Sequence, residues 1–171
     1  IKKQQEVLGG KLDSKNYTSE RLFATAHDGI KIPISIVRHV NTELNQDTPI
    51  LQYGYGSYGI TIDPSFSSVR LSLLDRGFVF AIAHIRGSQY LGRPWYENGR
   101  MLSKKNTFRD FVSCSKFLIE NNYTSKDHLY AEGGSAGGLL MGAIMNMAPE
   151  IYNGVISAVP FVDVITTMLD E

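Results

Sequence analysis

A chain of 171 residues, 43% hydrophobic and 20% charged, is long enough to bury one substantial core and has the composition of a soluble globular domain. Its 17 basic and 17 acidic residues cancel, which argues against a nucleic-acid or membrane partner, and no apolar run reaches the roughly 20 residues of a membrane span. The single cysteine, Cys114, excludes an internal disulfide, and we expect it to pack in the core. The first residues lack an apolar signal core, so together with the single cysteine they favour a reducing, cytoplasmic compartment.

The N-terminal part of the chain predicts an arm followed by a β-hairpin. Residues 1–19 are polar and aperiodic and suggest a linker or arm, whereas 20–171 are expected to form one domain. The segments 21–26 and 31–40 are rich in β-forming residues and flank a turn signal at 27–29, so they predict two antiparallel strands. The chain does not begin with Met, which suggests that it starts inside a longer one.

A short apolar strand is expected over 49–53, followed by the glycine- and tyrosine-rich segment 54–59. This segment lacks the Lys-Ser/Thr of a P-loop, and its glycines do not have the spacing of a dinucleotide-binding loop. We therefore expect no nucleotide cofactor and interpret 54–59 as a loop held close to a neighbouring element.

A helix and a buried strand are predicted next. The helix is expected over 66–76, and Gly77 is a signal for its end. Its inward residues are expected to be Phe66, Val69, Leu73 and Leu74. The near-continuous apolar run 78–85 predicts a strand covered on both faces. His84, at its end, is expected to be a hydrogen-bonded core residue more often than a catalytic one.

A long glycine-bearing loop is expected over 86–105, and loops of this length are often functional. Thr107 and Asp110 have the spacing of a capping box, which predicts that a helix begins there. Its residues at helical spacing are Phe108, Phe111, Val112, Ser115, Leu118 and Ile119.

A strand, a tight turn and a buried helix are predicted around Ser135. The strand 128–132 leads into the G-x-S-x-G pattern of a nucleophile elbow, formed by Gly133, Ser135 and Gly137. The backbone at such a serine is strained, and side chains on either side of it would collide with neighbouring elements, so both flanking positions need glycine. The helix is expected over 139–148, which is apolar almost all round.

The predicted elements are a hairpin and then strands that alternate with helices, ending in a strand over 154–159. This alternation implies right-handed βαβ crossovers and a mostly parallel sheet. Together with the elbow it predicts an α/β fold of the α/β-hydrolase type, in which the loop 54–59 supplies half of an oxyanion hole. A sheet ending at this point looks unfinished, so we expect the N-terminal portion of that fold, incomplete at the C-terminus.

A serine hydroxyl becomes a good nucleophile when a histidine, oriented by a carboxylate, removes its proton. In α/β-hydrolases the acid and the histidine follow the serine along the chain. The four histidines are His27, His39, His84 and His128. All of them precede Ser135, whereas Asp163 follows it and either is the acid or satisfies nearby backbone amides. Either the triad is completed beyond Glu171, which we favour, or the chain is not a working hydrolase.

Several segments resemble the catalytic domain of the prolyl oligopeptidase family of serine peptidases, closest to its oligopeptidase B (protease II) branch. They are 53–59, 71–77, 104–108, 133–138, 159–164 and 166–171. They occur in the family's order across almost the whole chain, which is far more specific than the elbow alone. The resemblance implies an α/β-hydrolase domain and a β-propeller that restricts access to peptides. The propeller is expected before Ile1 and the rest of the catalytic domain after Glu171.

The resemblance also implies roles for individual residues. Ser135 matches the nucleophile, and the backbone N–H of Ala136 and the hydroxyl of Tyr55 match the two oxyanion donors. Asp63 matches an acid that binds the second basic residue of a substrate. Ser65 stands where the family often has another acid, which argues against a strong dibasic preference. No metal and no cofactor is implied.

These observations predict part of a cytosolic serine oligopeptidase that hydrolyses short peptides after Arg or Lys through an acyl-enzyme. Its partners are expected to be peptide substrates and its own propeller. The 171-residue chain alone is expected to be inactive, because it has the nucleophile without its base. Two alternatives remain: an esterase or lipase-like α/β-hydrolase acting on a small ester, and an interaction domain that kept the fold and lost the triad.

Overall fold

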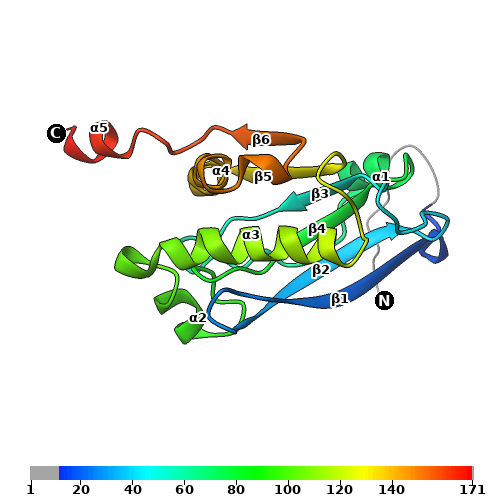
Figure 1. Cartoon of the computed structure of the whole chain (residues 1–171), viewed down its shortest axis with the longest axis horizontal. Helices are drawn as coiled ribbons and strands as arrows, with labels where there is room; N and C mark the ends of the chain where they lie inside the picture. The colour runs from blue at the N-terminus through cyan, green and yellow to red at the C-terminus, as the bar shows by residue number, and fades with distance from the viewer. Residues whose placement is uncertain (1–11, 171) are drawn as a thin grey trace, which may run out of the picture.

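The computed structural model describes residues 12–170, which form one six-stranded sheet with helices on both faces (Figure 1). The strands are β1 (Tyr17–Thr25), β2 (Lys31–His39), β3 (Ile50–Tyr53), β4 (Val79–Ala83), β5 (Leu129–Gly134) and β6 (Gly154–Ala158). Their order across the sheet is β1-β2-β4-β3-β5-β6. The pairs β1–β2 and β2–β4 are antiparallel, and β4, β3, β5 and β6 are parallel to one another. The predicted hairpin and mostly parallel sheet are therefore confirmed.

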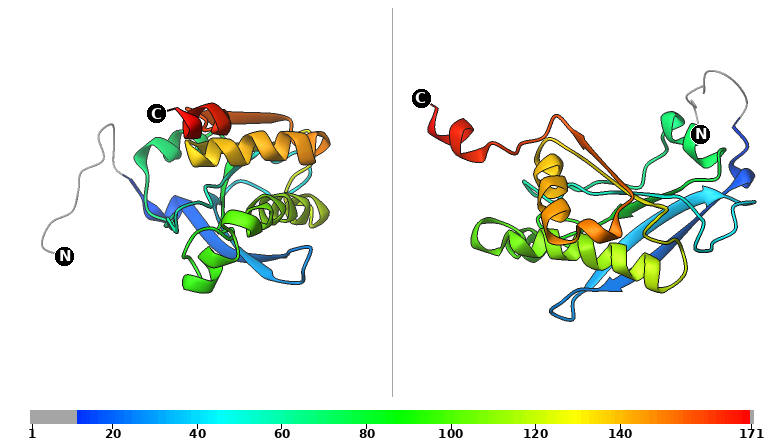
Figure 2. Two further views of the ribbon diagram at one scale, coloured as in Figure 1. Left: turned by 90° about the vertical axis from the view of Figure 1, so that its left-hand side faces the viewer. Right: turned by 45° about the horizontal axis from the view of Figure 1, so that its top comes forward.

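The helices are α1 (Ser68–Leu74), α2 (Arg93–Glu97), α3 (Lys105–Glu120), α4 (Ala136–Met147) and α5 (Val164–Leu169), with the 3-10 turns η1 (Ser14–Asn16), η2 (Met101–Ser103) and η3 (Pro149–Ile151). Helices α3 and α4 lie next to one another on one face of the sheet, and α1 packs on the other (Figure 2). Helix α5 stands at the end of an extended segment that leaves the sheet after β6 (Figure 1).

The core lies on both faces of β4. Every residue of this strand is buried, as expected for a parallel strand between two layers of helices. On one face, Phe111 of α3 and Ile144 of α4 are fully buried in the larger apolar cluster. On the other face, Phe80 packs with Leu74 of α1. Cys114 is also fully buried on α3, which confirms its predicted place in the core.

Strand β1 is longer than the sequence predicted. It begins at Tyr17, within the range expected as an arm, whereas the sequence placed its start at Arg21. Tyr17 pairs with His39 across the hairpin, its ring meets the His39 ring edge-on at 5.6 Å, and its hydroxyl donates to Asp75 at 2.6 Å. These partners are distant in sequence, so the local pattern did not reveal them. The rest of the expected arm, residues 1–11, lies outside the described residues.

The buried face of α1 differs from the prediction. Leu74 is buried and Leu73 half-buried, as predicted, but Phe66 is 60% exposed and Val69 is 85% exposed. The helix begins only after Phe66, which therefore does not share its face. Leu71 and Leu74 pack in the cluster on β4, and Val69 lies on a different side of the helix.

The start of α3 also differs from the prediction, because no capping box forms. The helix begins at Lys105, and the side chains of Thr107 and Asp110 are buried and bond to other segments. Thr107 Oγ1 donates to the carbonyl oxygens of Arg86 and Gly99 at 2.8 and 3.0 Å. Asp110 accepts hydrogen bonds from the Arg86 guanidinium. Both residues therefore tie α3 to the long loop before it, which contains α2.

Helix α4 buries one face only. Leu140, Met141 and Ile144 are buried against the sheet and α3, whereas Met145 and Met147 are nearly half exposed. The prediction of a helix buried all round is wrong for this outer face. Because both faces of the helix are apolar, the sequence pattern does not indicate which face is buried. The position of the sheet decides which face is covered.

Candidate active site

Four parallel strands end at one edge of the sheet, and the loops that follow them meet there. Strand β3 is followed by the loop 54–59, β5 by Ser135 and β6 by Val159. The chain runs from β3 to β4 on one side and later to β5 on the other, so the direction of winding reverses between β3 and β5. Ligands of α/β sheets bind at such a switch point. Tyr55 follows β3 and Ser135 follows β5, and these two strands border the switch point.

Ser135 occupies a strained turn between β5 and α4. Its φ of 55° and ψ of −116° lie in a region that costs a non-glycine residue on the order of 1–3 kcal/mol. A Cβ added at Gly133 would collide with the carbonyl oxygen of Gly137. One added at Gly137 would lie 2.9 Å from the carbonyl oxygen of Gly54. The turn therefore has no space for side chains on either side of Ser135, which itself stays exposed.

The peptide groups of Ser135 are held by the last residue of β6 and by the loop that follows it. Its N–H donates to the carbonyl oxygen of Ala158 at 2.9 Å, and its own carbonyl oxygen accepts from the N–H of Phe161 at 3.0 Å. Between these two partners, Val159 has a φ of 40°, an outlier for a β-branched residue. We name these two hydrogen bonds the Ser135 bracket. No local sequence pattern predicts this bracket, because its partners lie in segments far apart in the chain.

The loop 54–59 packs against the other side of the elbow. The N–H of Gly54 donates to the carbonyl oxygen of Glu132 at 3.1 Å, which fixes the start of the loop to β5. The ring carbon Cδ2 of Tyr55 lies 3.4 Å from the place that a Cβ of Gly137 would take. The absence of a side chain at Gly137 therefore lets the phenol ring lie directly beside the first turn of α4.

Two hydrogen-bond donors belong to the elements that meet at Ser135. Ala136 is the first residue of α4, so its N–H has no acceptor inside the helix, and a helix N-terminus favours negative charge. Burial, with a smaller effect of Tyr58, raises the pKa of Tyr55 and keeps its phenol protonated and able to donate. A hydroxyl, a helix N-terminus and a phenol are groups that acyl transfer uses.

None of the four histidines, all within the described residues, hydrogen-bonds to Ser135. His84 is buried, its Nε2 shares a hydrogen bond of 2.7 Å with Ser35 Oγ, and its ring stacks on Tyr90 at 3.7 Å. Burial, helped by the charge of Arg21, lowers the pKa of His84 to about 4, so the ring is neutral. The prediction of a hydrogen-bonded core histidine is confirmed.

The other three histidines are held elsewhere. His27, in the turn between β1 and β2, lies 3.3 Å from the Nη1 of Arg109. His39 ends β2, which runs antiparallel to β4, so it lies at the opposite edge of the sheet from the carboxyl ends of the parallel strands. His128 precedes β5, whereas Ser135 follows it. In the described chain, therefore, no histidine is positioned as the base.

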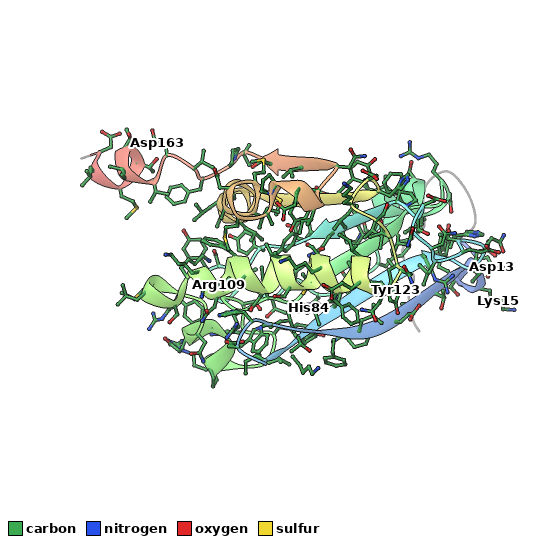
Figure 3. The ribbon with its side chains drawn as sticks, in the orientation of Figure 1. Asp13, Lys15, His84, Arg109, Tyr123 and Asp163 are labelled. Carbon is green, nitrogen blue, oxygen red and sulfur yellow. The ribbon has the colours of Figure 1, made fainter. Side chains whose placement is uncertain are left out.

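Asp163 caps α5. Its carboxylate accepts a hydrogen bond from the N–H of Thr166 at 3.2 Å, and the residue is exposed. Asp163 and His84 lie in well-separated parts of the molecule (Figure 3). Of the two roles that the sequence left open for Asp163, the structure shows the satisfaction of a backbone amide.

Asp63 lies on the exposed loop between β3 and α1. Together with Ser65, Arg70 and Glu132 it lines a cavity of about 590 Å³. The guanidinium of Arg70 lies 4.1 Å from the ring centroid of Phe80, and burial lowers the Arg70 pKa against the opposing effect of Glu132. The cavity therefore combines two carboxylates, from the loop and from β5, with one positive charge.

Among residues 12–170, no group of three or more His, Cys, Asp and Glu side chains is arranged to hold a metal ion. Over the same part of the chain, no helix combines the length and the apolar character needed to cross a membrane.

A family model described as the prolyl oligopeptidase family matches residues 64–171. Among curated proteins, dipeptidyl aminopeptidase BI of Pseudoxanthomonas mexicana is 52% identical over 169 residues, which are 98% of this chain and 23% of that protein. Protease 2 of Moraxella lacunata is 48% identical over 167 residues, which are 98% of this chain and 24% of that protein.

Solved structures agree with the family match. Oligopeptidase B from Leishmania major is 52% identical with a TM-score of 0.90, over 94% of this chain and 22% of that one. Oligopeptidase B from Trypanosoma brucei, with covalently bound antipain, is 50% identical with a TM-score of 0.90, over 94% of this chain and 23% of that one. The chain spans less than a quarter of the length of these relatives and has the α/β-hydrolase fold of their catalytic domain. It belongs to the prolyl oligopeptidase family of serine peptidases, as its motifs indicated.

Proposed function

We propose that this chain is part of the catalytic domain of a serine oligopeptidase that hydrolyses short peptides, with Ser135 as the nucleophile. The observation that carries the proposal is the strained, exposed serine between β5 and α4. A positive φ at a non-glycine residue persists only where its surroundings enforce it, and such residues cluster at reactive sites. Membership of a peptidase family supports the same reaction.

In the proposed reaction, the Oγ of Ser135 attacks the carbonyl carbon of the scissile peptide bond while a base removes the hydroxyl proton. The carbonyl oxygen becomes an oxyanion, which accepts hydrogen bonds from the Ala136 N–H and the Tyr55 hydroxyl. Collapse of this intermediate breaks the C–N bond, the amine leaves with the proton from the base, and an acyl ester remains on Ser135. Water then hydrolyses the ester and restores the free serine.

The base in this proposal is a histidine outside the 171 residues, because none of the four here bonds to Ser135. The matched relatives are long enough to supply it, since this chain covers 23% and 24% of two of them. We therefore infer that the chain alone does not hydrolyse peptides. We also propose that a β-propeller in the full-length protein restricts the active site, so that only short peptides enter it. A cytoplasmic location stays a prediction.

The residue recognised before the cleaved bond is proposed to be Arg or Lys. Two solved relatives, 52% and 50% identical, are named oligopeptidase B, and this similarity supports the proposal. Asp63, which we propose contacts a second basic residue of the substrate, shares its cavity with Glu132 and the cation Arg70. A relative that is 52% identical is named dipeptidyl aminopeptidase BI, which favours a second candidate, the release of dipeptides from a free amino terminus. The two candidates differ in whether the substrate must have that free terminus.

The full-length protein distinguishes these functions with a small panel of fluorogenic substrates. The panel contains an N-terminally blocked peptide amide ending in Arg, the same peptide ending in Pro, an unblocked dipeptide amide, and a small ester. We expect the blocked Arg amide to be hydrolysed best. Preference for the unblocked dipeptide supports the aminopeptidase, hydrolysis of the ester alone supports the esterase, and a folded but inactive protein supports the interaction domain.

Substitution of the nucleophile tests the role of Ser135. Ser135→Ala is expected to lower kcat by about 10⁴- to 10⁶-fold, because no other group can form the acyl ester. Ser113→Ala is the matched control, since that hydroxyl donates to the carbonyl oxygen of Arg109 within α3. A fluorophosphonate should label Ser135 in the parent and leave the variant unlabelled, as read by peptide mass spectrometry. Normal turnover by Ser135→Ala would overturn the proposal.

A further inference from the structure

The loop 54–59 is held by a lysine that has no part in the reaction as written above. Lys104 lies at the junction of η2 and α3. Its Nζ donates to the carbonyl oxygen of Gly56 at 2.6 Å and to the Oγ of Ser57 at 2.7 Å. Both acceptors directly follow Tyr55 in the chain. The lysine therefore joins the segment before α3 to the loop that carries the proposed phenol donor.

The surroundings of Lys104 are unusual for a lysine, which is normally solvated at the surface. Across residues 12–170, no carboxylate lies within ion-pair distance of its ammonium, and the ring centroid of Phe108 is 5.8 Å from the Nζ. Burial lowers the pKa of Lys104 to about 8. The two loop oxygens offset part of this desolvation, because they accept hydrogen bonds from the charged form. The two hydrogen bonds from Lys104 therefore hold the loop in a fixed position relative to the ammonium.

The rest of the loop is also anchored. Gly56 has a φ of +70°, and a Cβ there would press on side chains of the segments after β4 and at the start of α3. The N–H of Gly59 donates to the carbonyl oxygen of Gly87 at 3.0 Å. Because the start of the loop is bonded to β5, Tyr55 lies between fixed points on both sides. Among these anchors, the Lys104 ammonium is the charged group.

We propose that Lys104 is a positioning residue for the oxyanion hole, and that it fixes the loop so that the Tyr55 hydroxyl is held toward the carbonyl group attacked by Ser135. This inference rests on the proposed function, since it gives Lys104 a part in that reaction. Lys104 acts through Tyr55 and does not touch the substrate. Its contribution belongs to the transition state, where the phenol meets the developing charge, so its loss lowers kcat and leaves KM nearly unchanged.

The first variant for the test is Lys104→Met in the full-length protein, which keeps most of the side-chain volume and removes the N–H donors. We expect kcat to fall by about 10- to 100-fold, less than the 10²- to 10³-fold typical of deleting an oxyanion donor itself. KM should change by less than about twofold. Lys105→Met is the matched control, because Lys105 is adjacent and exposed, and it should keep the kcat of the parent.

A double-mutant cycle separates positioning from a general structural effect. If Lys104 acts through Tyr55, Lys104→Met should lower kcat by less than about twofold in a Tyr55→Phe background. The full loss in that background would overturn the inference, as would an unchanged kcat in Lys104→Met alone. If Ser135→Ala proves silent, the proposed function fails. If Ser135→Ala is damaging and either Tyr55→Phe or Lys104→Met is silent, only this inference fails.

A second variant keeps the test decisive if Lys104→Met does not fold. Ser57→Ala removes one of the two acceptors and leaves the ammonium in place. We expect kcat to fall by about threefold, in line with the loss of one hydrogen bond, and this effect should disappear in the Tyr55→Phe background. Calorimetry of each variant shows whether the fold is kept. A fall of equal size in both backgrounds would contradict the role proposed for Lys104.

Discussion

Ser135 is held in its turn from two directions. Gly133 and Gly137 leave no space for side chains beside it, and the partners in the Ser135 bracket, Ala158 and Phe161, fix its two peptide groups. The first constraint is local, so the G-x-S-x-G pattern predicted it. The second depends on where β6 joins the sheet, and no short motif marks it. At this scale the site consists of backbone geometry as much as of reactive side chains.

Gly133→Ala tests the local constraint. The new Cβ would collide with the carbonyl oxygen of Gly137, so the turn must open, and we expect a loss of about 2–4 kcal/mol of stability and at least a 100-fold lower kcat. Gly142→Ala is the control, since a Cβ there lies 3.5 Å from the Cγ1 of Val162, an ordinary contact, inside α4. Chemical denaturation and kinetics measure both effects. A Gly133→Ala variant with more than half of the parent activity would show that the turn tolerates a side chain.

Tyr55→Phe tests the proposed phenol donor. The ring and its packing remain and only the hydroxyl is lost, so kcat should fall by about 10²- to 10³-fold with little change in KM. A peptide aldehyde, which forms a tetrahedral adduct with the serine, should bind more weakly by a similar factor. Tyr58→Phe is the control because Tyr58 is 71% exposed on the same loop. Equal kcat values for the two variants would remove Tyr55 from the oxyanion hole.

Between elements, the buried Arg86 forms ion pairs with two aspartates and so joins three segments. The guanidinium of Arg86, in the loop after β4, donates to Asp110 of α3 at 2.8 and 2.6 Å and to Asp28 of the hairpin turn at 2.6 Å. The hydrogen bonds to Asp110 raise the pKa of Arg86, and Arg86 in turn lowers the pKa of Asp28. The cluster therefore fixes α3, and with it Thr107, beside the loop that approaches the site.

Removing the Asp110 charge leaves the buried Arg86 guanidinium with only the partly exposed Asp28 as a counter-ion. Asp110→Asn keeps the shape of the side chain, and we expect it to destabilise the catalytic domain by about 3–5 kcal/mol. Asp127→Asn, at an exposed position before β5, should change stability by less than about 0.5 kcal/mol. Urea denaturation of the full-length protein measures both. A loss below about 1 kcal/mol in Asp110→Asn would mean that water or Asp28 compensates the Arg86 charge and that Asp110 is not needed for it.

His84, directly after β4, hydrogen-bonds to Ser35 of β2, and its burial makes stability depend on pH. The folded pKa of about 4 lies below the unfolded value of about 6.5, so the unfolded state binds more protons between these values. The resulting stability is fully present above pH 6.5 and is lost, by up to about 3 kcal/mol, as the pH falls toward 4. His84→Gln should show a smaller drop in unfolding midpoint between pH 7 and pH 5. Equal drops in the variant and the parent would contradict this assignment.

Across the whole molecule, the sequence predicted what is encoded over short ranges. The turn of the hairpin, the apolar run of β4 and the elbow all have local signals, and each lies where the sequence placed it. Thr107 and Asp110 were misassigned because a hydroxyl and a carboxylate suit a helix cap and a distant backbone group equally well. The exposure of Phe66 could not be predicted, because its spacing fits a helix over 66–76, whereas α1 begins at Ser68.

The candidate site shows the same division. Ser135 and Tyr55 lie in segments with recognisable motifs, and they meet because β3 and β5 are neighbours in the sheet. Lys104 and Phe161 also lie in segments that resemble the family, but no role could be assigned to them from the sequence, because their roles depend on contacts with other segments. Such contacts follow from the sheet order, which the alternation of strands and helices leaves undetermined.

The Ser135 bracket makes the geometry of the serine depend on residues that are synthesised after it. Ala158 and Phe161 leave the ribosome later than Ser135, so the growing chain contains the serine before the bonds that hold its peptide can exist. Until β6 pairs with β5, neither bond of the bracket can form, and we expect the Ser135 backbone to relax toward an ordinary conformation. Translation order therefore delays the strained geometry of Ser135 until β6 has joined the sheet beside β5.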